Sequence, residues 1–194
     1  ENISKISDVT LWLEILQNIG AQIRMINKTT VEIDSRGVQN MQTSYDAMRQ
    51  MRASYYLISV MLGRFGHAEV AMPGGCDIGV RSIDQHIKGF EALGATVEIK
   101  NGLVIADAPN GLNGSNVYLD GASVGATINI MIAATQADGQ TVIENPAKEP
   151  HVVDIANFLN TMGADIKGAG TDMIKIRGRT PMHGCNYTII PDQI

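Results

Sequence analysis

Apolar residues recur at helical spacing in three places along the chain, and each time the pattern ends at a Gly-Ala pair. Such a stripe predicts an amphipathic helix packed on a core, and Gly is common just past a helix end. In the first helix the apolar stripe consists of Val9, Trp12, Leu13, Leu16 and Ile19. The phrases that end the three helices are Ile19-Gly20-Ala21, Leu93-Gly94-Ala95 and Met162-Gly163-Ala164, about 70 residues apart.

After each Gly-Ala pair the sequence predicts two short antiparallel strands. In each case apolar residues flank a turn-forming stretch, which is typical of a hairpin. The predicted strand pairs are Gln22–Ile26 with Thr30–Ile33, Thr96–Ile99 with Leu103–Ile105, and Asp165–Ile166 with Met173–Ile176.

Two further helices, at Met48–Phe65 and Ser123–Ala137, are apolar on nearly all sides. A helix without a polar face has to lie inside the protein. Each is followed by a predicted strand, at Glu69–Met72 or Thr141–Glu144. The complete unit is therefore predicted to contain a buried helix, a strand, an amphipathic helix and a hairpin. An unrelated pair of core helices in a plain sandwich is the alternative.

The repeat also makes a prediction about the two ends of the chain. Glu1-Asn2 matches Glu144-Asn145, at the end of a unit's first strand, and no initiator Met or secretory signal precedes it. We therefore expect Glu1 to be a fragment boundary inside the first repeat. Tyr187–Ile190 is predicted as one more strand, followed by a turn at Pro191-Asp192. Both termini should then lie together at the edge of a single domain, residues 1–194.

Composition narrows the class of protein. The chain has 194 residues and a net charge of -5, and nucleic-acid binding is not expected because it depends on a surplus of Lys and Arg. The longest mainly apolar stretches, Tyr55–Leu62 and Ile128–Ala134, fall short of the roughly 20 residues that span a membrane. Two cysteines are too few for a disulfide framework. We therefore expect a globular protein of a reducing cytoplasm.

A loop rich in glycine carries the first candidate for chemistry. Met72–Gly79 connects a predicted strand to a predicted helix and contains Cys76. A thiol whose thiolate is tuned by nearby cations acts as an acid, a base or a nucleophile, and Arg81 follows five residues later. An inert, buried cysteine is the alternative, and it is the favoured interpretation of Cys185.

The start of the second amphipathic helix is a candidate anion site. Arg81–Gln85 opens this helix, and Ser82 with Gln85 has the spacing of a capping box. Free backbone N–H groups and the helix dipole attract phosphate, and a guanidinium group binds two oxygens at once. A helix start that binds nothing, with solvated arginines, is the alternative. The two buried helices have comparable starts, at Arg49 with Arg52 and at Ser123–Ala126.

Glu149 is a further candidate. It precedes Pro150, which favours the first turn of a helix, so its carboxylate either serves a ligand or stabilises the helix dipole. The four histidines lack the spacing of metal ligands, and no Ser/His/Asp or phosphate-loop lysine pattern occurs. The sequence therefore predicts neither a metal nor a nicotinamide cofactor.

Several of these segments occur together, in the same order and at the same separations, in one family. They are Met51–Ser54, Pro73–Arg81, Ser123–Thr127, Glu149-Pro150, Gly170–Asp172 and Pro191–Ile194. On these segments, which extend over essentially the whole chain, the sequence resembles the UDP-N-acetylglucosamine enolpyruvyl transferases. The resemblance implies an α/β fold in two lobes. Each lobe is an inside-out barrel of threefold βαβαββ repeats, and the first repeat would be truncated here.

The resemblance also implies a reaction. The enolpyruvyl group of phosphoenolpyruvate is transferred to the 3'-hydroxyl of UDP-N-acetylglucosamine and phosphate is released, without a cofactor, in the first committed step of peptidoglycan synthesis. Cys76 is implied to be a proton donor on a mobile loop and the thiol that fosfomycin alkylates. The residues implied at the sugar nucleotide are Arg52, Arg81, Ser82, Ile83, Asp84, Gln85, Ser123 and Val124. Glu149 and Asp192 are implied to line the cleft.

Two positions depart from the family pattern. Ser82 stands where the family usually has proline, and Gly121 stands where many members carry a lysine near the nucleotide. The second lobe of the same protein is the expected partner, so the chain alone should be inactive. The alternatives are the shikimate-pathway enolpyruvyl transferase and a non-catalytic paralogue that keeps the fold.

Overall fold

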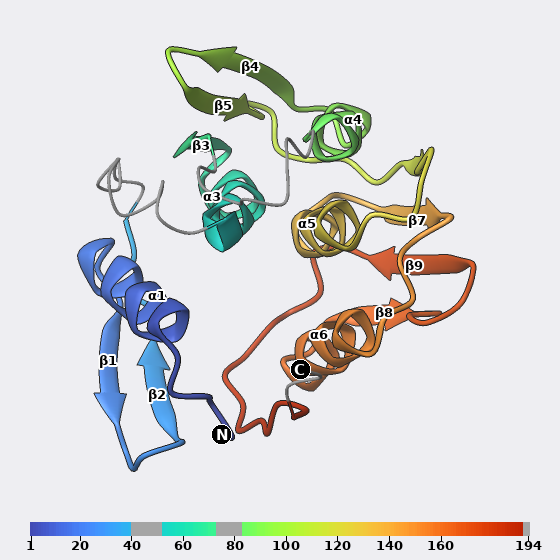
Figure 1. Ribbon diagram of the computed structural model, residues 1–194. Helices are drawn as coiled ribbons and strands as arrows, with labels where there is room; N and C mark the ends of the chain where they lie inside the picture. The colour runs from blue at the N-terminus through green and yellow to red at the C-terminus, as the bar shows by residue number, and fades with distance from the viewer. Residues whose placement is uncertain (40–51, 73–82, 192–194) are drawn as a thin grey trace.

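The computed structural model describes residues 1–39, 52–72 and 83–191. Its elements form three consecutive groups (Figure 1). The first group contains α1 (Ser7–Asn18), β1 (Gln22–Met25) and β2 (Val31–Asp34). The second contains the 3-10 helix η1 (Arg52–Tyr55), α3 (Tyr56–Phe65), β3 (His67–Ala71), α4 (Asp84–Ala92), β4 (Thr96–Lys100) and β5 (Leu103–Asp107). The third contains β6 (Asn116–Tyr118), α5 (Val124–Ala134), β7 (Gln140–Glu144), α6 (Pro150–Thr161), β8 (Asp165–Lys167) and β9 (Met173–Arg177).

The second and third groups share one order of elements, helix, strand, helix, strand, strand. In both, the first strand pairs antiparallel with the last one, giving the sheet orders β3-β5-β4 and β7-β9-β8. The three predicted hairpins are confirmed, including β1 with β2. Strand β6, which pairs parallel with β7, was not predicted from the sequence. It has only three residues and one buried side chain, Val117, too little for an alternating pattern.

The three helices end at the Gly-Ala phrases, as predicted, and all three ends have the same backbone motif. Gly20, Gly94 and Gly163 have φ values of 105°, 90° and 103°, a left-handed conformation that glycine adopts readily. Each glycine N–H donates to the carbonyl three residues earlier, and the next N–H donates to the carbonyl five residues earlier, over 2.9–3.0 Å. These are the two bonds of a Schellman motif, which satisfies carbonyls at a helix end.

Helix α5 lies at the centre of the second and third groups. Nine of its eleven residues are buried. Helices α3, α4 and α6 and strands β7 and β9 pack around it (Figure 1). The prediction that an apolar helix in Ser123–Ala137 lies inside the protein is therefore confirmed. Half of the residues of α3 are buried as well, which agrees with the same prediction for Met48–Phe65 over the described part of that range.

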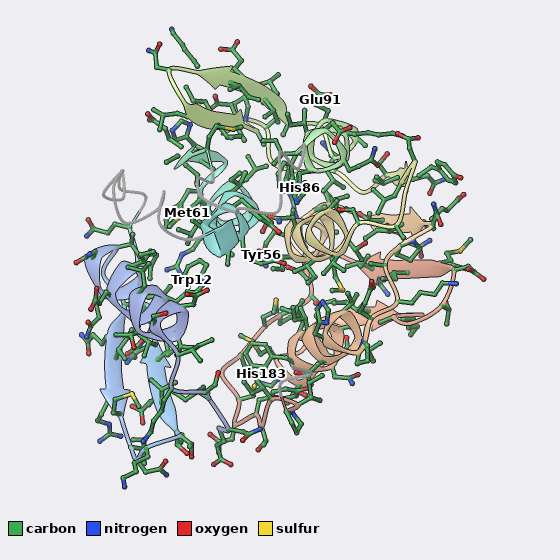
Figure 2. The ribbon with its side chains drawn as sticks, viewed as in Figure 1. Trp12, Tyr56, Met61, His86, Glu91 and His183 are labelled. Carbon is green, nitrogen blue, oxygen red and sulfur yellow. The ribbon has the colours of Figure 1, made fainter. Side chains whose placement is uncertain are left out.

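A glycine brings three helices together near the start of α5. His86 of α4 lies where α3, α4 and α5 meet (Figure 2). Its ring is nearly perpendicular to that of Tyr55, at 79° with the centroids 4.9 Å apart. A Cβ atom at Gly125 would lie 2.5 Å from the Tyr55 hydroxyl oxygen and 2.8 Å from His86 Nε2. The absence of a side chain at Gly125 therefore lets α5 approach both rings.

The two ends of the described chain lie side by side, as predicted (Figure 1). The Glu1 backbone nitrogen donates to the Tyr187 carbonyl at 2.7 Å, and the Ile189 N–H donates to the Glu1 carbonyl at 3.3 Å. The Asn2 side chain donates to the Ile189 carbonyl at 3.1 Å. The strand predicted at Tyr187–Ile190 is wrong, because the structure assigns no strand there. Its backbone bonds to Glu1 and Asn2, and the Ile190 N–H donates to the Asp154 carboxylate at 3.3 Å.

The predicted match between Glu1-Asn2 and Glu144-Asn145 is confirmed in the hydrogen bonding. The Leu119 N–H donates to the Glu144 carbonyl at 3.1 Å, and the Asn145 side chain donates to the Leu119 carbonyl at 2.8 Å. Both asparagines have left-handed backbones, with φ of 63° at Asn2 and 57° at Asn145. The same local structure therefore occurs twice in the chain.

Candidate functional site

The first part of the candidate site is the start of α5. Ser123 is the N-cap residue of this helix, and its hydroxyl accepts a hydrogen bond from the Ala126 N–H at 3.3 Å. Val124 is the first helical residue, and both side chains are partly buried. The first turn of a helix has backbone N–H groups without helical partners and carries the positive end of the dipole. The start of α5 therefore suits a negatively charged group.

The second part is the start of α4, where one prediction is wrong. The N-cap residue is Ile83, which is buried, and its side chain makes no capping hydrogen bond. Asp84 begins the helix and is exposed. The predicted capping box between Ser82 and Gln85 would place the helix start one residue earlier. The Gln85 side chain instead bonds to Asp120, which satisfies its amide and removes it from a capping role.

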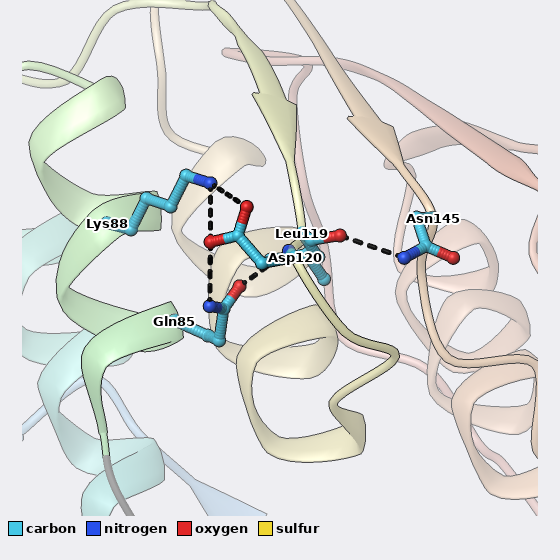
Figure 3. A network of polar contacts seen from close by, with 5 residues as sticks. All are labelled: Gln85, Lys88, Leu119, Asp120 and Asn145. Carbon is cyan, nitrogen blue, oxygen red and sulfur yellow. Dashed lines mark hydrogen bonds and ion pairs between the residues drawn. The ribbon is translucent and has the colours of Figure 1, made fainter.

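A network of polar contacts joins these two helix starts (Figure 3). The Lys88 ammonium group donates to the two carboxylate oxygens of Asp120 at 2.8 and 2.9 Å. The Gln85 side chain donates to the same carboxylate at 3.0 Å and accepts from the Asp120 N–H at 3.0 Å. The pKa of the Asp120 carboxyl group is lowered, mainly by the hydrogen bond from Lys88 and next by the one from Gln85. Asp120 therefore holds α4 beside the residues that lead into α5.

Glu149 lies in a third segment, between β7 and α6. It is the N-cap residue of α6, with Pro150 at the start of the helix as predicted, and it is exposed. Its carboxylate accepts no hydrogen bond from the residues that the structure describes. Two bonds attach the segment to α5 and to Leu119, the residue that follows β6. The Ala147 N–H donates to the buried Thr127 hydroxyl at 3.0 Å, and the Asn145 side chain donates to the Leu119 carbonyl.

The structure thus brings together three of the predicted segments, namely Ile83–Gln85, Ser123–Val124 and Glu149. Arg52 is the first residue of η1, and only its backbone is described. The other predicted site residues lie outside the described residues: Arg49, Cys76, Arg81, Ser82 and Asp192.

Three residues near the site were not predicted: Lys88, Asp120 and Asn145. Gln85 and Lys88 are three apart, so they share one face of a helix. That spacing indicated a common surface, but nothing in the sequence pairs this face with a carboxylate more than thirty residues later. The asparagine had a clearer signal, because the phrase Glu-Asn occurs at both Glu1-Asn2 and Glu144-Asn145.

A cavity of about 400 Å³ lies at the other ends of α3 and α5. Its lining includes Arg64, Gln136 and Arg179 and none of the predicted site residues. We place the candidate site at the helix starts, because the predicted residues converge there. Within residues 1–39, 52–72 and 83–191, no group of three or more His, Cys, Asp or Glu side chains could hold a metal ion. No helix in the same ranges is long and apolar enough to span a membrane.

Solved structures define the class of fold. The enolpyruvyl transferase NikO from Streptomyces tendae has a TM-score of 0.80 at 22% sequence identity, over 94% of this chain and 43% of that chain. An EPSP synthase from Acinetobacter baumannii has a TM-score of 0.70 at 20% identity, over 94% of this chain and 41% of that chain. The chain therefore has the α/β fold of enolpyruvyl transferases.

The sequence comparison then gives the family. The family model of EPSP synthase (3-phosphoshikimate 1-carboxyvinyltransferase) matches residues 1–194, and the chain belongs to this family. UDP-N-acetylglucosamine 1-carboxyvinyltransferase 2 of Clostridium acetobutylicum and UDP-N-acetylglucosamine 1-carboxyvinyltransferase of Clostridium botulinum are each 56% identical to it over all 194 residues. The chain covers 46% of each of them, so it spans about half the length of the curated relatives it matches.

Proposed function

We propose that this chain is the lobe of a UDP-N-acetylglucosamine 1-carboxyvinyltransferase that carries the active-site cysteine. The enzyme would transfer the enolpyruvyl group of phosphoenolpyruvate to the 3'-hydroxyl of UDP-N-acetylglucosamine and release phosphate, in the cytoplasmic synthesis of peptidoglycan. The observation that carries this proposal is the 56% identity, over the whole chain, to relatives of that name. Sequence identity at this level is stronger support for the substrates of those relatives than the fold is, because NikO and EPSP synthase have the same fold.

In this proposal, residues 1–194 form one domain, an inside-out barrel of threefold βαβαββ repeats. The shared element order of the second and third groups supports it, as does the central, buried α5. The bonds that join Glu1 and Asn2 to Ile189 repeat those that join Glu144 and Asn145 to Leu119. The first repeat would be completed by residues that precede Glu1 in the full-length protein.

The sugar nucleotide would bind at the starts of the inner helices. The proposed contacts are Arg52, Arg81, Ser82, Ile83, Asp84, Gln85, Ser123 and Val124, with Arg49 as a further cation. Free N–H groups at a helix start and guanidinium groups both suit a diphosphate. Because Ile83 is buried, its contribution would come from the backbone. Glu149 is an exposed carboxylate at the same end of α5, and with Asp192 it would line the cleft.

The proposed chemistry has two steps and needs no cofactor, because it exchanges a carbon–oxygen bond without oxidation or reduction. The 3'-oxygen adds to the enol carbon as the hydroxyl proton passes to a base, and a proton is delivered to the neighbouring methylene carbon. Phosphate then leaves as a proton is lost from that carbon, which restores the double bond. Cys76 would deliver the proton of the first step. Positioned donors around a cleft closed to water would stabilise the charges that develop.

The second lobe of the same protein is the proposed partner. Two anionic substrates held by one lobe alone would remain open to water, which weakens electrostatic stabilisation of the transition state. We therefore expect the 194-residue chain on its own to release no phosphate.

The test is phosphate release by the full-length protein, with phosphoenolpyruvate and either UDP-N-acetylglucosamine or shikimate 3-phosphate. We expect release only with UDP-N-acetylglucosamine. In the Cys76→Ala variant we expect a loss of about a hundredfold or more, as for a removed general acid. Release with shikimate 3-phosphate alone would identify the shikimate-pathway enzyme instead. No release with either acceptor would indicate a non-catalytic paralogue.

A further inference from the structure

We propose that Asp120 is a positioning residue for the sugar nucleotide. It fixes the spacing between the start of α4 and the start of α5, so that donors on both segments meet one ligand. This inference rests on the proposed function, because it assumes that a sugar nucleotide binds these two helix starts. Asp120 itself acts through Gln85 and Lys88 and need not contact substrate.

Asp120 makes several contacts with α4 rather than a single ion pair. We call Asp120, Gln85 and Lys88 together the clamp. The Asp120 carboxylate accepts from Lys88 on both oxygens and from Gln85 on one, and the Asp120 backbone N–H donates to the side-chain amide oxygen of Gln85. Gln85 and Asp120 therefore bond in both directions, which fixes orientation as well as distance. Gln85 is the second residue of α4, and Asp120 comes three residues before the N-cap Ser123. These contacts thus join the N-terminal half of α4 to the residues just before α5.

A further hydrogen bond fixes the turn at Leu119 and Asp120, on the side away from α4. The carbonyl of Leu119, next to Asp120, accepts the side chain of Asn145 at 2.8 Å (Figure 3). Leu119 is fully buried, so this part of the backbone is fixed in the core. The turn before α5 is therefore connected to α4 through Asp120 and to the segment of Glu149 through Leu119. These three segments carry the proposed substrate contacts Ile83–Gln85, Ser123–Val124 and Glu149.

The exposure of the clamp indicates a role in the site rather than in the stability of the fold. The Lys88 and Asp120 side chains are 42% and 62% exposed. Ion pairs this exposed contribute little to folding stability because water screens them. An extended anionic ligand, however, needs donors on two elements at a set distance, and small errors in position reduce its binding. The clamp meets that need without being part of the core.

The experiment compares steady-state kinetics of full-length variants. For Asp120→Ala we expect the KM for UDP-N-acetylglucosamine to rise about fivefold, the size of effect for a lost exposed ion pair and its hydrogen bonds. The KM for phosphoenolpyruvate should stay within about twofold, since the clamp acts on uniform binding of the other substrate. Asp120→Asn keeps an acceptor for Gln85 and should recover part of the loss. Lys88→Met should add little to Asp120→Ala, because both remove the same pair.

Asp138→Ala is the matched control. Asp138 forms an ion pair with Arg179 at 3.0 Å, with side chains 64% and 54% exposed, beyond the other end of α5. It should leave both KM values unchanged. An Asp120→Ala variant with the same KM for UDP-N-acetylglucosamine as Asp138→Ala would overturn the inference while leaving the proposed function intact. A wild-type protein that does not use UDP-N-acetylglucosamine would overturn the proposed function and this inference with it.

Discussion

Gly125 shows how one position controls the arrangement of side chains behind the candidate site. It lies in the first turn of α5, directly against the Tyr55 hydroxyl and the His86 ring. The Tyr55 and His86 rings pack edge to face, an arrangement that itself favours a fixed separation. The Tyr55 and His86 rings thus pack behind the site at the starts of α4 and α5, and they leave no room for a methyl group at position 125.

We predict that Gly125→Ala lowers the free energy of unfolding by about 1–3 kcal/mol, the usual effect of inserting a methyl group into a packed interior. The added Cβ would meet the Tyr55 hydroxyl oxygen and His86 Nε2 at less than 3.0 Å, so Tyr55 or His86 must move. Urea denaturation of the full-length protein measures the change.

Gly121→Ala is the control for this substitution, because a Cβ at Gly121 meets nothing within 4 Å. It lies four residues before Gly125 on the same approach to α5. Equal losses of stability in both variants would contradict the packing explanation.

At the scale of elements, the segment between β7 and α6 depends on one hydroxyl of α5. Thr127 is fully buried, and its hydroxyl accepts the Ala147 N–H. A buried N–H without an acceptor is costly in free energy. This single bond therefore helps to fix the segment that ends at Glu149.

We predict that Thr127→Val, which keeps the shape of the side chain, lowers the free energy of unfolding by about 1–3 kcal/mol, the range for a buried N–H left without an acceptor. Urea denaturation is again the measurement. If Glu149 lines the cleft as proposed, the same variant should also lower kcat/KM.

Thr135→Val provides the comparison. The Thr135 hydroxyl donates to the Ile132 carbonyl at 2.7 Å, but this carbonyl also accepts the Thr135 N–H. When the hydroxyl is removed, the Ile132 carbonyl still accepts the Thr135 N–H, so we expect a smaller decrease in the free energy of unfolding. A Thr135→Val variant that is less stable than Thr127→Val would argue against the role of the Ala147 bond.

The elements themselves could largely be predicted from the sequence. The apolar sides of α5 and the Gly-Ala phrases are local signals, because helix burial and helix ends depend on neighbouring residues. The contacts that build the site are not local. Gln85 and Asp120 are distant in sequence, and a surface carboxylate has many possible partners. The capping box predicted for Ser82 and Gln85 is wrong for this reason, because the Gln85 side chain bonds to Asp120 instead.

At the scale of the whole molecule, Tyr187 attaches the C-terminal segment to α6. Its hydroxyl donates to the Asp154 carboxylate at 2.7 Å and to the Asp154 carbonyl at 3.1 Å. Its ring packs against Phe158, with the centroids 5.0 Å apart. The pKa of Tyr187 is raised to about 12 from a usual value of 10.0. Partial burial is the main cause, and the hydrogen bond to Asp154 is the next.

A raised pKa means that folding favours the protonated phenol. This contribution to stability is fully present below about pH 10, the unfolded value, and is lost as the pH rises toward about 12. We predict that the free energy of unfolding falls less steeply over this window in Tyr187→Phe than in wild type. Ultraviolet absorbance of the phenolate, wild type minus variant, should show one group that ionises near pH 12.

Asp154→Asn keeps an acceptor for the hydroxyl but removes the negative charge. The pKa of Tyr187 should then fall toward its ordinary value. A difference titration in wild type that is already complete near pH 10 would show that the contact with Asp154 does not form in solution.

The burial of α5 also has a consequence for the motions of the protein. Amide protons of a helix enclosed on all sides exchange with solvent only when the surrounding structure opens, at a free energy close to that of global unfolding. Ser123 and Val124 sit at one end of this helix and are therefore attached to what should be the slowest-exchanging part of the chain. A ligand that binds there meets donors already held in place, so little conformational entropy is lost when it binds.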